Sequence, residues 1–119
     1  MRHATFALAI ALALAVAACG EQTPIEKARV DYLRTCSLCH GGQGQGMGNL
    51  GNSLQDNEFI RSHSDDELVA FLKRGRSPSD PDNRSGVAMP PKGGDPRLTD
   101  EDLRHLVLLL RQWTPQGAS

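Results

Sequence analysis

The chain has 119 residues, a formal net charge of −1 and only 4% aromatic residues. A charge so close to neutral gives no support for nucleic-acid binding, which depends on a basic surface. The length fits one small domain, and a domain of this size buries too little surface to be comfortably stable alone.

The first residues are typical of an export segment. A short basic start, Met1-Arg2-His3, precedes an apolar run over residues 4–17 that is interrupted only by Thr5. This run is too short for a comfortable membrane span. Small residues follow it up to Cys19, a pattern similar to bacterial lipoprotein signals.

In such a signal, residues 1–18 are removed as a signal peptide and Cys19 carries the lipid. Residues 19–23 then form a short tether, which spans at most about 14 Å from Gly20 to Thr23 when extended. We therefore expect an exported protein held by its lipid anchor on the periplasmic side of a bacterial membrane. The alternative is an ordinary secretory signal, which leaves Cys19 as a free thiol on a soluble periplasmic domain.

A helix is predicted directly after the tether, over residues 24–35. Thr23 and Glu26 can form a capping box, and Pro24 suits the first helical position. The predicted buried face is formed by Ile25, Ala28 and Tyr32.

The next five residues, Cys36-Ser37-Leu38-Cys39-His40, read C-x-x-C-H, the covalent attachment signature of a c-type haem. Two thiols about one helical turn apart can each add to one of the neighbouring vinyl groups of a porphyrin. His40 is then held under the iron as its fifth ligand. One covalent haem c would also act as a large apolar core component, which explains why few aromatic residues suffice.

Two other interpretations of the Cys pair are half of a zinc site and a thiol–disulfide redox pair. Zinc would need a second pair of ligands, and with Cys19 in the export segment no Cys remains to form one. A redox C-x-x-C is expected near a βαβ pattern in a cytosolic chain, and the sequence shows neither.

A glycine-rich loop follows over residues 41–52. We interpret it as backbone that passes close beside a flat porphyrin, with a flexible linker as the alternative. Residues 54–60 are expected to form one helical turn with Asp56 as its cap. A second capping box at residues 64–67 starts a helix that ends at Gly75.

The rest of the chain contains one irregular loop and one long helix. Residues 76–88 are rich in Ser, Pro, Asp and Asn and predict the loop. The last helix begins after its cap, Thr99, with three acidic residues, and Pro115 stops it. Its predicted buried stripe is formed by Leu103, Leu106, Val107, Leu110 and Trp113.

Met89 is the predicted sixth ligand of the iron. Its thioether is soft and suits reduced iron, and the two prolines after it restrict the backbone. The weaker candidates are Met47, whose short connection to His40 would be strained, His63, which precedes a helix cap, and His105, which lies off the apolar stripe. Ligation by His and Met fills both axial positions and favours electron transfer. An open position would instead favour a site for small gases or peroxide.

Taken together, these residues resemble the small monohaem class I cytochrome c family. Ala28 and Tyr32 match the small and aromatic residues of its first helix, and Leu110 and Trp113 match the pair on its last helix, which crosses the first. Met89 followed by proline matches the ligand loop.

The resemblance implies an all-α cytochrome c fold, three to five helices wrapped around one covalently bound haem. The domain would cover residues 24–115, followed by a tail at 116–119. Where the family commonly has Gly-Pro-x-Leu, this chain has Gly51-Asn52-Ser53-Leu54, so the Asn52 carbonyl takes the place of the proline carbonyl that orients the proximal histidine.

The family also implies an electron carrier, and not an enzyme, that works with redox protein partners at the membrane surface. The alternative functions are a haem subunit of a larger oxidoreductase and an open-site haem protein. The oligomeric state stays open. Five basic residues fall near the expected haem edge, where a cluster would steer an acidic partner; a merely solvated surface is the alternative. They are Lys73, Arg74, Arg76, Lys92 and Arg97.

Overall fold

A computed structural model of the chain describes residues 20–117. The predicted signal peptide at 1–18 and the predicted lipid site at Cys19 lie outside the described residues. Within residues 20–117, no helix is both long enough and apolar enough to cross a membrane.

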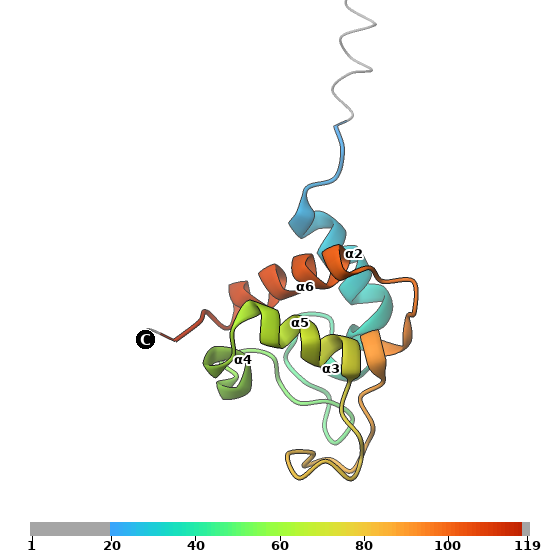
Figure 1. Ribbon diagram of the computed structural model, residues 1–119, viewed down its shortest axis with the longest axis vertical. Helices are drawn as coiled ribbons and strands as arrows, with labels where there is room; N and C mark the ends of the chain where they lie inside the picture. The colour runs from blue at the N-terminus through green and yellow to red at the C-terminus, as the bar shows by residue number, and fades with distance from the viewer. Residues whose placement is uncertain (1–19, 118–119) are drawn as a thin grey trace, which may run out of the picture.

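The described chain is helical. Its α-helices are α2 (Pro24–Thr35), α3 (Ser37–His40), α4 (Glu58–Ser62), α5 (Asp65–Arg74) and α6 (Asp100–Trp113), with a 3-10 helix η1 (Pro91–Gly94) before the last one. Over residues 20–117 the only β-type pairings are two isolated bridges, Met47 with Gly51 and Arg76 with Met89. The all-α prediction is confirmed, and Figure 1 shows α2 crossing α6 while α5 lies along the other side of α6.

Each of the three longer helices begins with a capping box. The boxes of α2 and α5 are predicted from the sequence, whereas for α6 the sequence predicts only Thr99 as the cap. Thr23, Ser64 and Thr99 each accept a hydrogen bond from the backbone N–H three residues later, and the acidic side chain at that position bonds back to the cap. These reciprocal bonds satisfy backbone donors that have no partner within the helix. They fix where α2, α5 and α6 start, and therefore where their apolar faces point.

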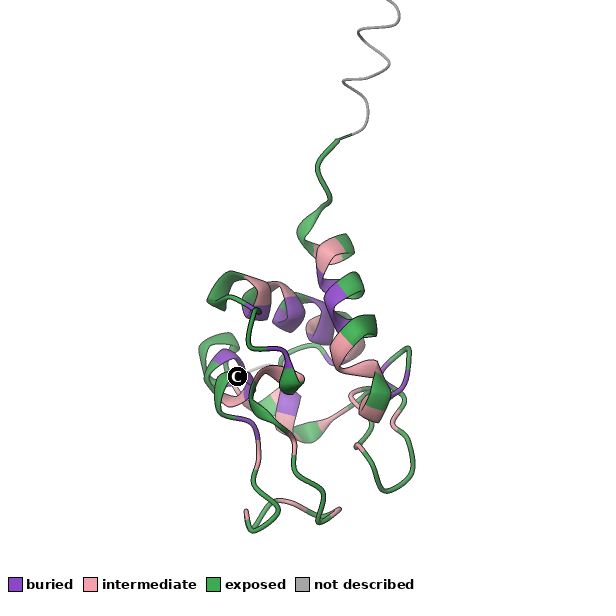
Figure 2. Cartoon of the chain, turned by 90° about the vertical axis from the view of Figure 1, so that its right-hand side faces the viewer, coloured by how far each residue is buried: buried purple, intermediate pink, exposed green. Residues whose placement is uncertain are grey.

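The core forms where α2, α5 and α6 meet, and Figure 2 shows the buried residues gathered there. Ala28 is fully buried at the crossing of α2 and α6, since a small residue lets the two helices approach closely. Tyr32 packs edge-on against Trp113 with 5.0 Å between the ring centres. Ile60 and Leu98 also belong to the core, and the rest of it is leucine and valine from α5 and α6: Leu68, Val69, Leu72, Leu103, Leu106, Val107, Leu109 and Leu110.

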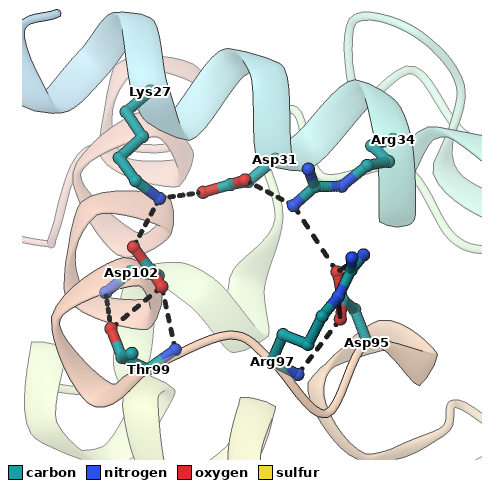
Figure 3. Close-up of polar contacts among 7 residues, drawn as sticks. All are labelled: Lys27, Asp31, Arg34, Asp95, Arg97, Thr99 and Asp102. Carbon is teal, nitrogen blue, oxygen red and sulfur yellow. Dashed lines mark hydrogen bonds and ion pairs between the residues drawn. The ribbon is translucent and has the colours of Figure 1, made fainter.

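A network of charged side chains joins α2 to the start of α6 and to the segment after η1 (Figure 3). Lys27 Nζ lies 2.8 Å from Asp31 and 2.5 Å from Asp102. Arg34 lies 2.8 Å from Asp31 and 3.5 Å from Asp95. Asp31 is buried but carries a cation on each side, so its charge is compensated. The network holds the chain between η1 and α6 against α2.

The helical turn predicted at 54–60 with Asp56 as its cap is wrong in position. The helix α4 starts at Glu58, and Asn57 caps it by accepting a hydrogen bond from the Ile60 N–H. The reason is tertiary. The Asn57 N–H donates to the Thr114 hydroxyl at 3.0 Å, so the end of α6 sets the register of α4.

Candidate functional site

A largely apolar cavity opens beside the junction of α2 and α3. Its wall is built from that junction, the end of the glycine-rich loop, α4, α5, the segment leading to residue 89, and α6. The four residues that the sequence predicts to hold a haem, Cys36, Cys39, His40 and Met89, all lie in this wall. Most of the remaining wall is apolar, including Leu38, Leu54, Phe59, Ile60, Leu68, Phe71, Leu72, Val87, Leu106 and Leu110.

The two cysteines lie on a single helical turn, with Cys36 as the N-cap of α3 and Cys39 within it. The His40 N–H donates to the Cys36 carbonyl at 3.0 Å, which closes the turn. Burial, with a further effect of the Asp31 carboxylate, raises the pKa of the Cys36 thiol to about 11. A thiol with so high a pKa is rarely ionised to the reactive thiolate. This disfavours the interpretation of Cys36 and Cys39 as a thiol–disulfide redox pair. Neither Cys36 nor Cys39 is in a disulfide.

Tyr32 connects α2 to the beginning of the glycine-rich loop. Its buried hydroxyl donates to the Gly41 carbonyl at 2.6 Å. Burial raises the pKa of Tyr32 to about 12, so the hydroxyl keeps its proton and remains a donor. This bond fixes the residue that directly follows His40.

The His40 ring is oriented by the glycine-rich loop. Its Nδ1 atom lies 2.7 Å from the Asn52 carbonyl oxygen. A carbonyl only accepts, so the proton of the neutral ring sits on Nδ1 and the Nε2 lone pair is free to bind a metal. Orientation of a ligand histidine through its second nitrogen is the usual arrangement in metal sites. The predicted role of the Asn52 carbonyl is therefore confirmed in its geometry.

Gly51 makes that contact possible. A Cβ atom at this position would collide with the Cys39 carbonyl and would lie 3.1 Å from His40 Nδ1. Gly51 lies in the cavity wall. The atoms that demand a glycine here belong to the protein itself, a reason that the sequence analysis, which expects the loop to pass close beside a porphyrin, does not include.

Met89 is held in the wall by backbone pairing. Its N–H donates to the Arg76 carbonyl at 2.9 Å, and its carbonyl accepts from the Arg76 N–H at 2.8 Å. Gly75 permits this pairing, because a Cβ there would collide with the Met89 carbonyl. Pro90 follows in an extended conformation. The backbone of Met89 is thus held in place by this pairing, in the same cavity wall as Cys36, Cys39 and His40.

The other candidate ligands lie elsewhere. Met47, His63 and His105 are all absent from the wall of this cavity. Met47 is 45% exposed, and the His63 ring stacks on Phe59 while bonding to that residue's carbonyl at 2.7 Å. His105 is less exposed than the sequence suggests, since its Nδ1 is buried without a hydrogen-bond partner among the described residues. Within residues 20–117, His40 and Met89 supply the imidazole and the thioether of the wall.

The basic cluster expected at the haem edge is largely engaged in internal contacts. Lys73 pairs with Asp100 at 3.0 Å, and Arg97 pairs with Asp95 at 2.9 Å. The Lys92 amine donates to a backbone carbonyl at 2.8 Å. Arg76 lines the cavity, so it is a candidate site residue rather than part of an outer surface.

The residues present fit a haem c. Two thiols one turn apart, an oriented imidazole and a thioether are the donors that covalent attachment and axial ligation require. The apolar wall suits a porphyrin ring. The buried Nε of Arg76 lines the same cavity and finds no acceptor among the described residues. An arginine that lacks a protein partner at this place is consistent with a ligand that carries a negative charge.

Comparison with known proteins identifies the family. A family model described as "Cytochrome C oxidase, cbb3-type, subunit III" matches residues 23–110, a span that contains every residue of the cavity wall. No curated protein and no solved structure matches the chain. The chain therefore belongs to this family of small class I c-type cytochromes, carries covalently bound haem c, and takes part in electron transfer.

Proposed function

We propose that this protein is a monohaem cytochrome that carries single electrons between membrane-associated redox partners. The observation that carries the proposal is the presence of His40 and Met89 in the wall of one cavity, together with Cys36 and Cys39. When bound there, haem c supplies a centre that gains and loses one electron.

The protein's own residues then have distinct roles. Cys36 and Cys39 would hold the haem through two thioether links, and His40 would bind its iron through Nε2. Met89 would supply a sulfur ligand. With both ligands in place no position would be left for a substrate, and a thioether ligand would raise the reduction potential. Such a site favours electron transfer over chemistry on a bound molecule.

The proposed location is the periplasmic side of a bacterial membrane, with a lipid anchor on Cys19. Residues 20–22 precede α2 and are exposed, so the tether is short. A domain held so closely meets its partners at the membrane surface. Cleavage by an ordinary signal peptidase, with a soluble periplasmic product, is the alternative that mass spectrometry of the purified protein would identify.

A second candidate function is that of a bound haem subunit in a larger oxidoreductase. It is favoured by the family description, which names a subunit of an oxidase. Solubilisation of the membranes in mild detergent separates the two functions. A free carrier elutes alone, whereas a subunit elutes with a larger complex that contains additional haem.

The electron-carrier proposal is tested by redox titration and carbon monoxide binding. Protein expressed with the haem-attachment machinery is expected to titrate as a one-electron centre. Without denaturant, its reduced form is expected not to bind carbon monoxide, because Met89 would occupy the sixth ligand position of the iron. Rapid carbon monoxide binding by the reduced wild type would replace the carrier with an open-site haem protein.

A further inference from the structure

We propose that the Arg76 guanidinium holds a carboxylate of the haem, so that one residue fixes both the haem edge and the sulfur ligand. Haem c carries two propionate side chains in addition to its apolar ring, and these need partners where they are buried. The inference rests on the placement of haem c proposed above. It assigns a further binding residue, for the anionic part of the cofactor.

The side chain of Arg76 packs between aromatic rings and has no carboxylate partner among the described residues. Its guanidinium carbon lies 4.9 Å from the ring centre of Phe59 and 4.9 Å from that of Phe71. These two contacts hold the planar group by cation–π attraction. They offer no hydrogen-bond acceptor, and the buried Nε has none among the described residues.

Four other arginines of the described chain differ in this respect. Arg34, Arg61, Arg97 and Arg111 each lie within ion-pair distance of an aspartate. Arg76 makes no ion pair with any residue between 20 and 117. The residue is partly exposed, but its buried Nε–H is costly to leave without an acceptor, so the acceptor is expected to come from what fills the cavity.

A carboxylate is the anion that suits this site. The guanidinium presents its N–H groups in a rigid plane that matches the two oxygens of a carboxylate. The cavity wall contains no aspartate or glutamate among the described residues, so a carboxylate there meets no like charge from the wall. Arg84 also lines the cavity, but it is exposed, and solvent weakens its effect.

The backbone of the same residue bonds to Met89. The two hydrogen bonds between Arg76 and Met89, at 2.8 and 2.9 Å, form an isolated antiparallel bridge. The side chain of Arg76 therefore places the haem edge relative to the segment that supplies the thioether. This makes Arg76 a residue on which both cofactor position and cofactor charge depend.

The test is the reduction potential of the haem-loaded protein in Arg76→Gln, with Arg74→Gln as its matched control. Arg74 lies 5.5 Å from the Phe71 ring centre but is exposed and absent from the cavity wall. Loss of the Arg76 charge leaves the haem carboxylate without its cation, and this stabilises the more positive, oxidised iron. We expect the equilibrium constant for reduction to fall on the order of tenfold, about 59 mV for one electron. Arg74→Gln is expected to change it less than threefold.

Arg76→Lys and infrared spectroscopy keep the proposal testable if Arg76→Gln folds poorly. Arg76→Lys keeps the charge and is expected to recover most of the potential. The carboxylate stretching bands of the haem are expected to shift in both Arg76 variants and to stay unchanged in Arg74→Gln. Equal potentials and unchanged carboxylate bands in wild type and Arg76→Gln would overturn the proposal. The axial pair is judged separately by the sulfur–iron absorption band, which is expected in wild type and in Arg76→Gln.

Discussion

The Nδ1 atom of His40 and the carbonyl oxygen of Asn52 lie 2.7 Å apart. This contact leaves the Nε2 lone pair of the ring free to bind a metal and fixes the plane of the ring. The carbonyl is backbone, so the residue type at position 52 matters less than the path of the chain there. That path depends on Gly51, where the loop passes against the Cys39 carbonyl.

The first prediction concerns this close approach. Gly51→Ala introduces a methyl group against the Cys39 carbonyl and the His40 ring, and the loop has to move. We expect the free energy of unfolding to fall by about 1–3 kcal/mol, as in overpacked cores. The measurement is denaturant unfolding of the oxidised, haem-loaded protein.

Gly42→Ala serves as the control for Gly51→Ala. Nothing lies within 4 Å of a Cβ at Gly42, and the residue is exposed. Its expected effect is within about 0.5 kcal/mol. If Gly51→Ala is as stable as Gly42→Ala, the loop does not constrain His40 in the way described here.

The sequence was sufficient to predict the helices that carry their own start signals. Thr23, Ser64 and Thr99 act locally, so their capping boxes are readable from the residues three positions on. The sequence alone misplaces the start of α4, because Asn57 is selected as its cap by a contact with Thr114, far along the chain. No local pattern carries that information.

The site shows the same division between local and distant effects. Cys36, Cys39 and His40 are adjacent in sequence, and Met89 is marked by the prolines that follow it. In the sequence, Arg76 is only one of several basic residues near the expected haem edge. Its role depends on two phenylalanines, on α4 and α5, and on a bridge to Met89, and these come together only in the folded chain.

The second prediction concerns the crossing of α2 and α6. Ala28 is completely buried there, in the core formed with α6. Ala28→Leu is expected to reduce the free energy of unfolding by about 1–3 kcal/mol, because the helices must separate or repack. Thermal unfolding followed by circular dichroism measures the change.

Val30→Leu is the matched control for Ala28→Leu. Val30 lies on the same helix but is 49% exposed, so a larger side chain meets solvent. Its effect is expected to stay within about 0.5 kcal/mol. Equal unfolding temperatures for both variants would contradict the close packing of α2 on α6.

The third prediction concerns stability in acid. The pKa of Asp102 is lowered to about 2, mainly by the hydrogen bond from Lys27. The pKa of Asp95 is also lowered to about 2, mainly by the hydrogen bond from Arg97. A carboxylate with a lowered pKa in the folded state stabilises the fold above its ordinary pKa, which is 3.8. Stability is therefore expected to fall as the pH drops from about 4 to about 2.

Asp102→Asn tests this contribution. It removes the ion pair with Lys27 and weakens the cap of α6, so the expected loss is about 1 kcal/mol at pH 7. The pH dependence of its unfolding between about 2 and 4 should be shallower than in wild type. Asp82→Asn, in an exposed loop, should retain the wild-type slope. A variant curve parallel to wild type would refute the role of the α2–α6 charge network in acid stability.

Electron transfer by this protein depends most directly on Met89 as the proposed sulfur ligand, and the optical spectrum of the oxidised, haem-loaded protein tests that ligation. A sulfur–iron(III) bond gives a weak far-red absorption band. We predict this band in wild type and in Met47→Ala, whose side chain is exposed outside the cavity, and its loss in Met89→Ala. A wild-type spectrum without the band, or a Met89→Ala spectrum that retains it, would contradict the proposed ligation.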